Sequence, residues 1–136
     1  MIYTDLEAWK EARILVKLVY LNLVNFPKDE LFGLQSQIRR SIVSIPSNIA
    51  EGSGRNHRKD TLQFFYIARG SIYELETQLY LSFDLGFLQE EVLNKLLNQI
   101  RIVRKLLAGL INYFKSKSFP WYIGSISYTF KVIIDF

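Results

Sequence analysis

Apolar residues recur every three or four positions along four long stretches of this 136-residue chain. That spacing is typical of amphipathic α-helices, and it predicts helices over about 5–25, from 30 or 34 to 52, over 58–85 and over 89–115. The stretches are separated by residues that end helices, namely Pro27, Gly52, Gly54 and Gly86. Four long helices with short connections predict an all-α fold, an up-down antiparallel four-helix bundle that occupies residues 1–115 as one domain.

Each predicted helix carries one apolar stripe that we expect to face the core. The third helix is assigned the stripe Phe64, Ile67, Ile72, Leu75, Leu79 and Phe83. Other large apolar residues fall off the main stripes, and these are Tyr20, Leu21, Val24, Phe65, Tyr66, Tyr80 and Leu81. Apolar patches of this kind are usually covered by a partner, so the sequence predicts a homo-oligomer.

The last residues, 116–136, break the helical pattern. They are rich in aromatic and β-branched residues, and 126–132 alternate as a strand would. We expect this atypical tail to lie outside the bundle core. Its Pro120, Gly124 and Lys131 also argue against a membrane span, which requires roughly 20 consecutive apolar residues.

The segment 44–60 is the most unusual part of the chain, because Pro46 interrupts the pattern of the second helix. A proline in a helix removes an amide donor and clashes with the carbonyl four residues earlier, here that of Ile42, so a kink is expected. Asn48 is the expected side-chain donor to the freed carbonyls. Small residues in the third helix, Ala68, Gly70 and Ser71, are expected where this part of the second helix packs closely. We predict a structural motif made of six residues on the two helices: Pro46, Asn48, Glu51, Gly52, Gly70 and Ser71.

Basic residues cluster around the same segment, and they are Arg39, Arg40, Arg55, Arg58 and Lys59. Glu51 is the one acid among them before Asp60, and we expect it to pair with Arg40, with Arg55 or with the N-terminus of the third helix. One interpretation is a solvated surface; the other is contact with nucleic-acid phosphates beside a helix N-terminus. The glycines lack the spacing of a nucleotide-binding loop, and no aromatic residues are interleaved for base stacking. Contact with the backbone, without sequence reading, is therefore the expected mode.

The composition argues against several classes of function. The chain has no Cys and a single His, so neither a thiolate nor a histidine metal site is expected, and His57 lacks a recognisable catalytic partner. We therefore predict no catalytic residue, no metal and no cofactor. The net charge of +4 is compatible with an anionic partner. The lack of Cys and of an N-terminal signal segment favours the cytoplasm.

Two blocks of sequence are distinctive: Ser44-Ile45-Pro46-Ser47-Asn48-Ile49-Ala50-Glu51-Gly52 and Ala68-Arg69-Gly70-Ser71-Ile72-Tyr73-Glu74. They are accompanied by Trp9, Ala12, 26–27, 30–34, 37–41 and 85–88. Over about residues 1–115 the chain resembles the bacterial four-helix-bundle family of 23S rRNA intervening-sequence proteins, which includes the accessory protein of diversity-generating retroelements. The tail after Lys115 departs from this family, whose members usually end with the fourth helix.

The resemblance implies a pentameric barrel with a basic surface and no enzymatic activity. It implies RNA or DNA as a partner and, in the retroelement branch, a reverse transcriptase. Two hypotheses follow from the residues and the resemblance together. The protein is either a nucleic-acid-binding accessory subunit or an oligomeric scaffold for proteins, whose charges are incidental.

Overall fold

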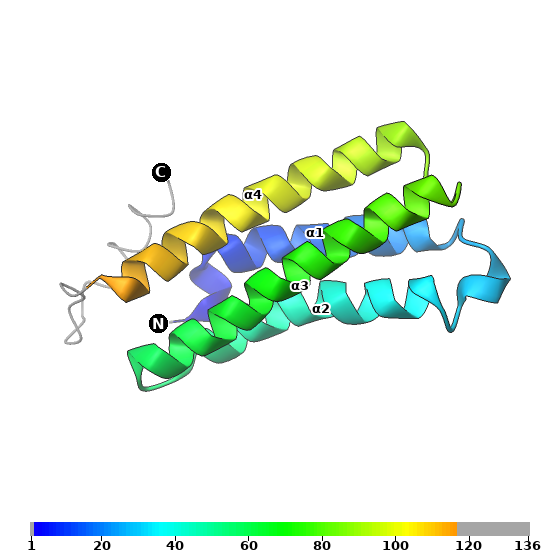
Figure 1. The fold of residues 1–136 in the computed structure, drawn as a ribbon. Helices are drawn as coiled ribbons and strands as arrows, with labels where there is room; N and C mark the ends of the chain where they lie inside the picture. Colours follow the sequence, from blue (N-terminus) through cyan, green and yellow to red (C-terminus); the bar gives the residue numbers. More distant parts are fainter. Residues whose placement is uncertain (1, 117–136) are drawn as a thin grey trace.

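The computed structural model describes residues 2–116, which form a bundle of four antiparallel α-helices (Figure 1). The helices are α1 (Glu7–Leu23), α2 (Leu34–Ser53), α3 (Arg58–Asp84) and α4 (Glu90–Lys115), with short 3-10 helices η1 (Tyr3–Asp5) and η2 (Lys28–Glu30). The predicted all-α four-helix bundle is confirmed. The strand predicted over 126–132, and the rest of the tail beyond Ser116, lie outside the described residues.

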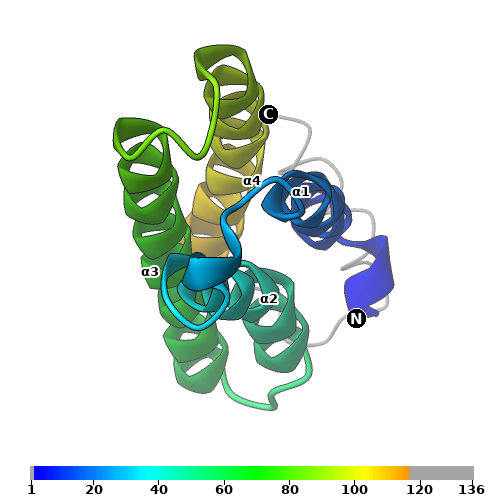
Figure 2. The same cartoon turned by 90° about the vertical axis from the view of Figure 1, so that its right-hand side faces the viewer.

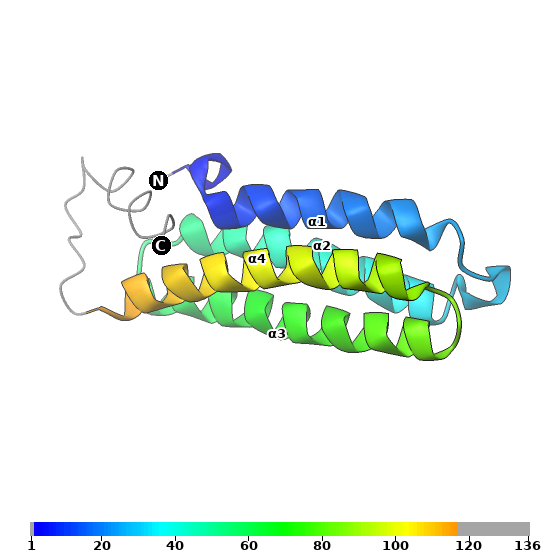
Figure 3. The same cartoon turned by 90° about the horizontal axis from the view of Figure 1, so that it is seen from above.

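The helices follow one another around the bundle in chain order. Each packs against the next, and α4 closes the ring by packing against α1 (Figure 2). Because the connections are short, the helices alternate in direction. The start of α1, the α2–α3 turn and the end of α4 therefore lie together at one end of the bundle (Figure 3).

The core consists of one apolar stripe from each helix, with large side chains such as Leu15, Ile45 and Ile100 fully buried. The stripe predicted for α3 is wrong in its first half. Phe65 is fully buried, whereas Phe64 is half-buried and Ile67 is 45% exposed. The core register of α3 runs through Phe65, Ala68, Ile72, Leu75 and Leu79, at regular spacings of three and four. A stripe through residues 64 and 67 must advance five positions to reach 72, instead of three or four, and it therefore leaves the core face. Phe83, which the predicted stripe also included, is 36% exposed.

The three glycines expected to end helices behave differently from one another. Gly86 follows α3 with φ of +81°, and its amide donates to the Phe83 carbonyl at 3.0 Å. The helix therefore ends where the sequence predicted, and Gly86 closes it in the left-handed conformation that was expected of Gly52 and Gly54. Gly54 follows α2 with an ordinary φ of −90°. Gly52 lies inside α2 and is buried there. A Cβ atom on Gly52 would lie 2.9 Å from Cε1 of Phe65, so this glycine is required by close packing against α3.

The close contact between α2 and α3 depends on small polar residues. The Ser41 hydroxyl donates to the Gln78 side-chain oxygen at 2.7 Å, and the hydroxyls of Ser44 and Ser71 lie 2.8 Å apart. Ala68 is fully buried at the same contact, as expected. The expectation for Gly70 is wrong. It faces outward, and a Cβ atom on it would find nothing within 4 Å. Positions 68 and 71 lie on the buried side of α3, and position 71 contacts Ser44 of α2, whereas position 70 lies on the opposite side of the helix.

The helix α2 is continuous through Pro46. None of the helices within residues 2–116 is both long enough and apolar enough to cross a membrane.

Candidate nucleic-acid interface

The turn between α2 and α3 carries three of the five predicted cations within a few residues. Backbone hydrogen bonds close this turn, because the amide of Gly54 donates to the Glu51 carbonyl and that of Arg55 to the Gly52 carbonyl. The extended His57 then starts α3, and its carbonyl accepts the amides of Asp60 and Thr61, both at 3.1 Å. The turn therefore holds its basic residues beside the N-terminus of a 27-residue helix.

Arg55 lies flat against the protein surface. Its guanidinium carbon is 4.5 Å from the ring centroid of Phe64, and its Nη2 lies 3.8 Å from Oε2 of Glu51. Of the three partners considered for Glu51, the structure therefore shows an ion pair with Arg55. About half of the Arg55 side chain remains exposed, at 48%. Phe64 is also an aromatic residue beside the basic cluster, which the sequence analysis did not expect. Its contact with Arg55 holds the guanidinium in one place.

Arg58 contacts the end of α4. Its Nη1 donates to the Ser116 carbonyl at 3.3 Å, and the side chain is partly buried. A cation at this position interacts favourably with the negative end of the α4 dipole. Lys59, the next residue, is exposed. Arg58 therefore contacts a carbonyl of its own chain, whereas Lys59 and about half of the Arg55 side chain are exposed to solvent.

Arg39 and Arg40 lie far from the turn. About 15 residues of helix separate them from Arg55, which corresponds to roughly 22 Å along the axis. Arg39 lies over the ring of Tyr20 on α1 at 5.8 Å, and its Nε is buried with no hydrogen-bond partner among the described residues. Arg40 is exposed. The five predicted cations thus form two separate groups rather than one patch.

The Pro46 segment supports this surface from inside the bundle. The Asn48 amide donates to both the carbonyl and the hydroxyl of Ser44, at 2.8 and 2.9 Å. Asn48 therefore donates to Ser44 and not to the carbonyl of Ile42, which lacks a donor because Pro46 has no amide hydrogen. The expected partner of Asn48 was wrong. Through Ser44 the side chain of Asn48 is linked to Ser71 of α3. The interaction joins α2 to α3 between two and three helical turns before α2 ends at the basic turn.

No group of three His, Asp or Glu side chains within residues 2–116 is placed to hold a metal ion.

Burial raises the pKa of Tyr113, near the end of α4, above its ordinary value of 10.0.

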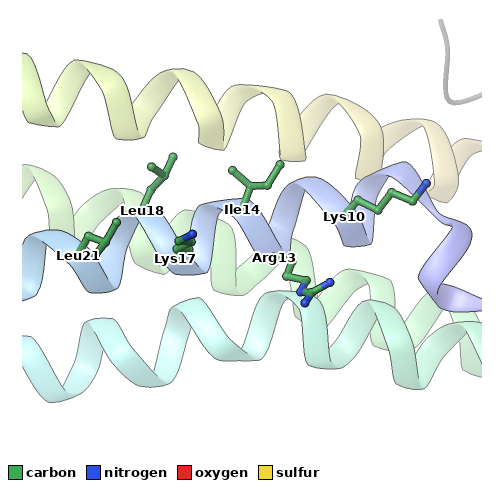
Figure 4. A pocket seen from close by; sticks show the side chains of 6 residues that line it. All are labelled: Lys10, Arg13, Ile14, Lys17, Leu18 and Leu21. Carbon is green, nitrogen blue, oxygen red and sulfur yellow. The ribbon is translucent and has the colours of Figure 1, made fainter.

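A second basic surface, along α1, was missed by the sequence analysis. A groove of about 620 Å³ is lined by Lys10, Arg13, Ile14, Lys17, Leu18 and Leu21 (Figure 4). Its signal in the sequence is a set of cations three or four residues apart, with apolar residues between them, on the side opposite the core stripe. The same pattern is typical of an ordinary solvated helix face, so the sequence alone does not distinguish the two.

Comparison with known proteins bears on the whole bundle. A family model described as 23S rRNA-intervening sequence protein matches residues 4–109. The chain belongs to this family. The match spans α1 to α3 and most of α4, so the Pro46 segment and both groups of cations lie within the family region. A search of curated proteins found no match.

Proposed function

We propose that this member of the 23S rRNA-intervening sequence protein family is a non-enzymatic, self-assembling accessory protein that binds RNA or DNA through phosphates. The observation that carries the proposal is the placement of Arg55, Arg58 and Lys59 at the α2–α3 turn, beside the N-terminus of α3. Free amides and the dipole at a helix N-terminus attract anions, and nearby cations reinforce that attraction.

The cations must supply most of the attraction. Asp60 lies in the first turn of α3, where it already offsets part of the positive field. Arg55 is held by Phe64 with about half of its surface exposed, which leaves its guanidinium available to a phosphate oxygen. Contacts of this kind position a nucleic acid but carry no sequence information, so little sequence preference is expected.

Assembly is part of the proposal, because one copy offers only a few phosphate contacts. Each neutralised duplex phosphate contributes about −0.9 to the slope of log K against log salt concentration, so one copy would bind weakly. Several copies linked in one particle can bind far more tightly than one. We propose a homo-oligomer, and the resemblance to the family suggests five copies. In a cytoplasmic setting, a reverse transcriptase would be a further partner if the protein serves a retroelement.

The test is a binding titration with fluorescently labelled RNA and DNA duplexes of two unrelated sequences, over a series of salt concentrations. A variant with Arg55, Arg58 and Lys59 changed together to Gln should bind at least about tenfold more weakly at low salt, with a shallower salt slope. The matched control changes three exposed cations of α4, namely Lys95, Arg101 and Lys105, to Gln. It removes the same net charge and should bind almost as the parent does. Circular dichroism and light scattering establish that fold and assembly are intact.

The alternative is an oligomeric scaffold that binds proteins and has no nucleic-acid role. The observation that favours it is that Arg55 and Arg58 already contact groups of their own chain, Glu51 and Ser116. If the parent fails to bind either nucleic acid at low salt, the scaffold alternative is favoured. Equal loss of binding in the α4 control would instead indicate attraction to net charge alone, without a defined interface.

A further inference from the structure

The outward side of α1 carries an exposed stripe that no other helix of the described chain covers. Its members, hereafter the α1 face, are Lys10, Arg13, Ile14, Lys17, Leu21 and Val24. They recur every three or four residues, on the side opposite the buried Ala8, Ala12, Leu15, Val19 and Leu23. Leu21 is 60% exposed and Val24 is 79% exposed, which is unusual for large apolar side chains placed in one row.

The charge of the α1 face limits what can cover it. Three cations line its groove and no acidic residue does (Figure 4). Lys10 has a partner in Glu7 at 3.3 Å, and Arg13 lies over the Trp9 ring, whereas Lys17 points outward from the middle of the row. A covering surface must therefore bring apolar side chains together with negative charge near its centre.

The outward side of α3 has this composition. Its members, hereafter the α3 face, are Tyr66, Ile67, Gly70, Tyr73, Glu74, Tyr80 and Leu81. The five large apolar members are between 37% and 50% exposed. The acid, Glu74, is exposed near the middle of the row, where its Oε1 accepts a hydrogen bond from Nε2 of Gln78 at 3.2 Å, and Asp84 is exposed beyond its end. Arg69 borders the row, where it lies over Tyr66.

Gly70 supplies an independent observation on the same face. It lies in the interior of α3, where glycine weakens a helix relative to alanine. Its Cβ position is open, so no packing within one copy requires a glycine there. A small residue at this point allows the backbone of another helix to approach closely.

We infer that the α1 face of one copy docks on the α3 face of a second copy. The two rows have matching lengths, since residues 10–24 and 66–81 each span about 21–23 Å of helix. Lys17 lies at the centre of the first row and Glu74 within one residue of the centre of the second. These two side chains therefore meet whether the docked helices run parallel or antiparallel.

The contact is head-to-tail. Because α1 and α3 occupy opposite corners of the bundle (Figure 2), one copy can use both faces at the same time. A contact between two different faces continues from copy to copy until it closes into a ring, so it produces assemblies larger than a dimer. This inference rests on the self-association included in the proposed function, and it names the surfaces responsible.

Sedimentation velocity of the purified protein at 0.15 M salt, without nucleic acid, tests the inference. Charge reversal by Lys17→Glu or by Glu74→Lys should weaken association at least about tenfold, since each places like charges at the centre of the contact. Gly70→Leu should weaken it similarly, because the added side chain fills the point of approach. Lys105→Glu on α4 changes the net charge as Lys17→Glu does and should leave the mass unchanged. Circular dichroism checks the fold of each variant.

Two further samples test the pairing itself. The double variant Lys17→Glu with Glu74→Lys restores opposite charges and should regain assembly. An equimolar mixture of the two single variants should also assemble. The intact α1 face of one variant docks on the intact α3 face of the other, and the two reversed faces again carry opposite charges. Assembly that persists at the parent mass in both single variants would overturn the inference alone and leave self-association standing. A parent that is monomeric at about 100 µM would refute both.

Nucleic-acid binding by the same variants shows whether the α1 face contacts phosphates or a second copy of the protein. If Lys17→Glu keeps the parent mass but loses binding to RNA or DNA, the α1 face contacts phosphates and the inference is wrong. If Lys17→Glu loses mass while the Gln variant of Arg55, Arg58 and Lys59 keeps it, assembly and phosphate binding use separate surfaces, as inferred.

Discussion

The hydroxyl of Ser44 on α2 lies 2.8 Å from the hydroxyl of Ser71 on α3, and the Asn48 amide donates to Ser44 from within α2. This short chain of polar contacts joins the two helices next to Pro46, and all three side chains are buried or half-buried. The contact therefore depends on hydrogen bonds that water cannot readily replace.

Asn48→Leu should lower the free energy of unfolding by about 1–3 kcal/mol, because it removes the donor to Ser44 and leaves polar groups unsatisfied in a partly buried place. The matched control is Ser47→Ala, one residue earlier and exposed, which should change it by less than about 0.5 kcal/mol. Urea denaturation measures both. Equal stability of Asn48→Leu and the parent would refute this role for Asn48.

Two glycines should respond in opposite directions to the same substitution. Gly52→Ala should destabilise the protein by about 1–3 kcal/mol, because the added Cβ would lie about 3 Å from the side chains of Phe64 and Phe65. Gly70→Ala meets open space and should raise the free energy of unfolding by up to about 1 kcal/mol in dilute protein. Thermal and urea melts at low concentration compare the two. If both variants are stabilised, the close packing at Gly52 is not rigid.

Adjacent phenylalanines on α3 should also differ. Phe65 is fully buried, with its ring centroid 5.5 Å from that of Phe114, so Phe65→Ala should cost about 3–5 kcal/mol of stability. Phe64 is half-buried beneath Arg55, and Phe64→Ala should cost about half as much or less. Denaturant midpoints provide the comparison. A larger loss from Phe64→Ala would mean that α3 faces the core in the register predicted from sequence.

Stability should fall at alkaline pH through Tyr113. Its pKa is raised in the folded protein by burial, so the unfolded chain ionises first, near the ordinary value of 10.0. The contribution of this residue is complete below pH 10 and is lost as the pH rises from there through the raised folded pKa. The parent should therefore lose more stability than Tyr113→Phe between pH 9 and pH 11, measured by urea melts at each pH. Parallel curves for the two proteins would show that Tyr113 does not contribute.

The number of helices, their approximate ends and the bundle fold could all be predicted from the order of the residues. These features follow from local periodicity, from Pro27 and from Gly86, which act within a few residues of the chain. The basic residues around the α2–α3 turn could also be named from sequence, because charge is a property of composition.

Features that depend on which residues meet across helices could be read only from the packed bundle. Only packing placed Phe65 rather than Phe64 in the core and turned Gly70 outward, since both registers of α3 offered apolar or small residues. It also divided the five cations into two groups, because Arg39 lies beside Tyr20 of α1 and Arg58 beside the end of α4. The cations of α1 line one groove because the buried residues of this helix lie on its opposite side. Only the packed structure shows which side that is. Local spacing fixes each helix, whereas the rotation of a helix about its axis is set by the neighbours it packs against.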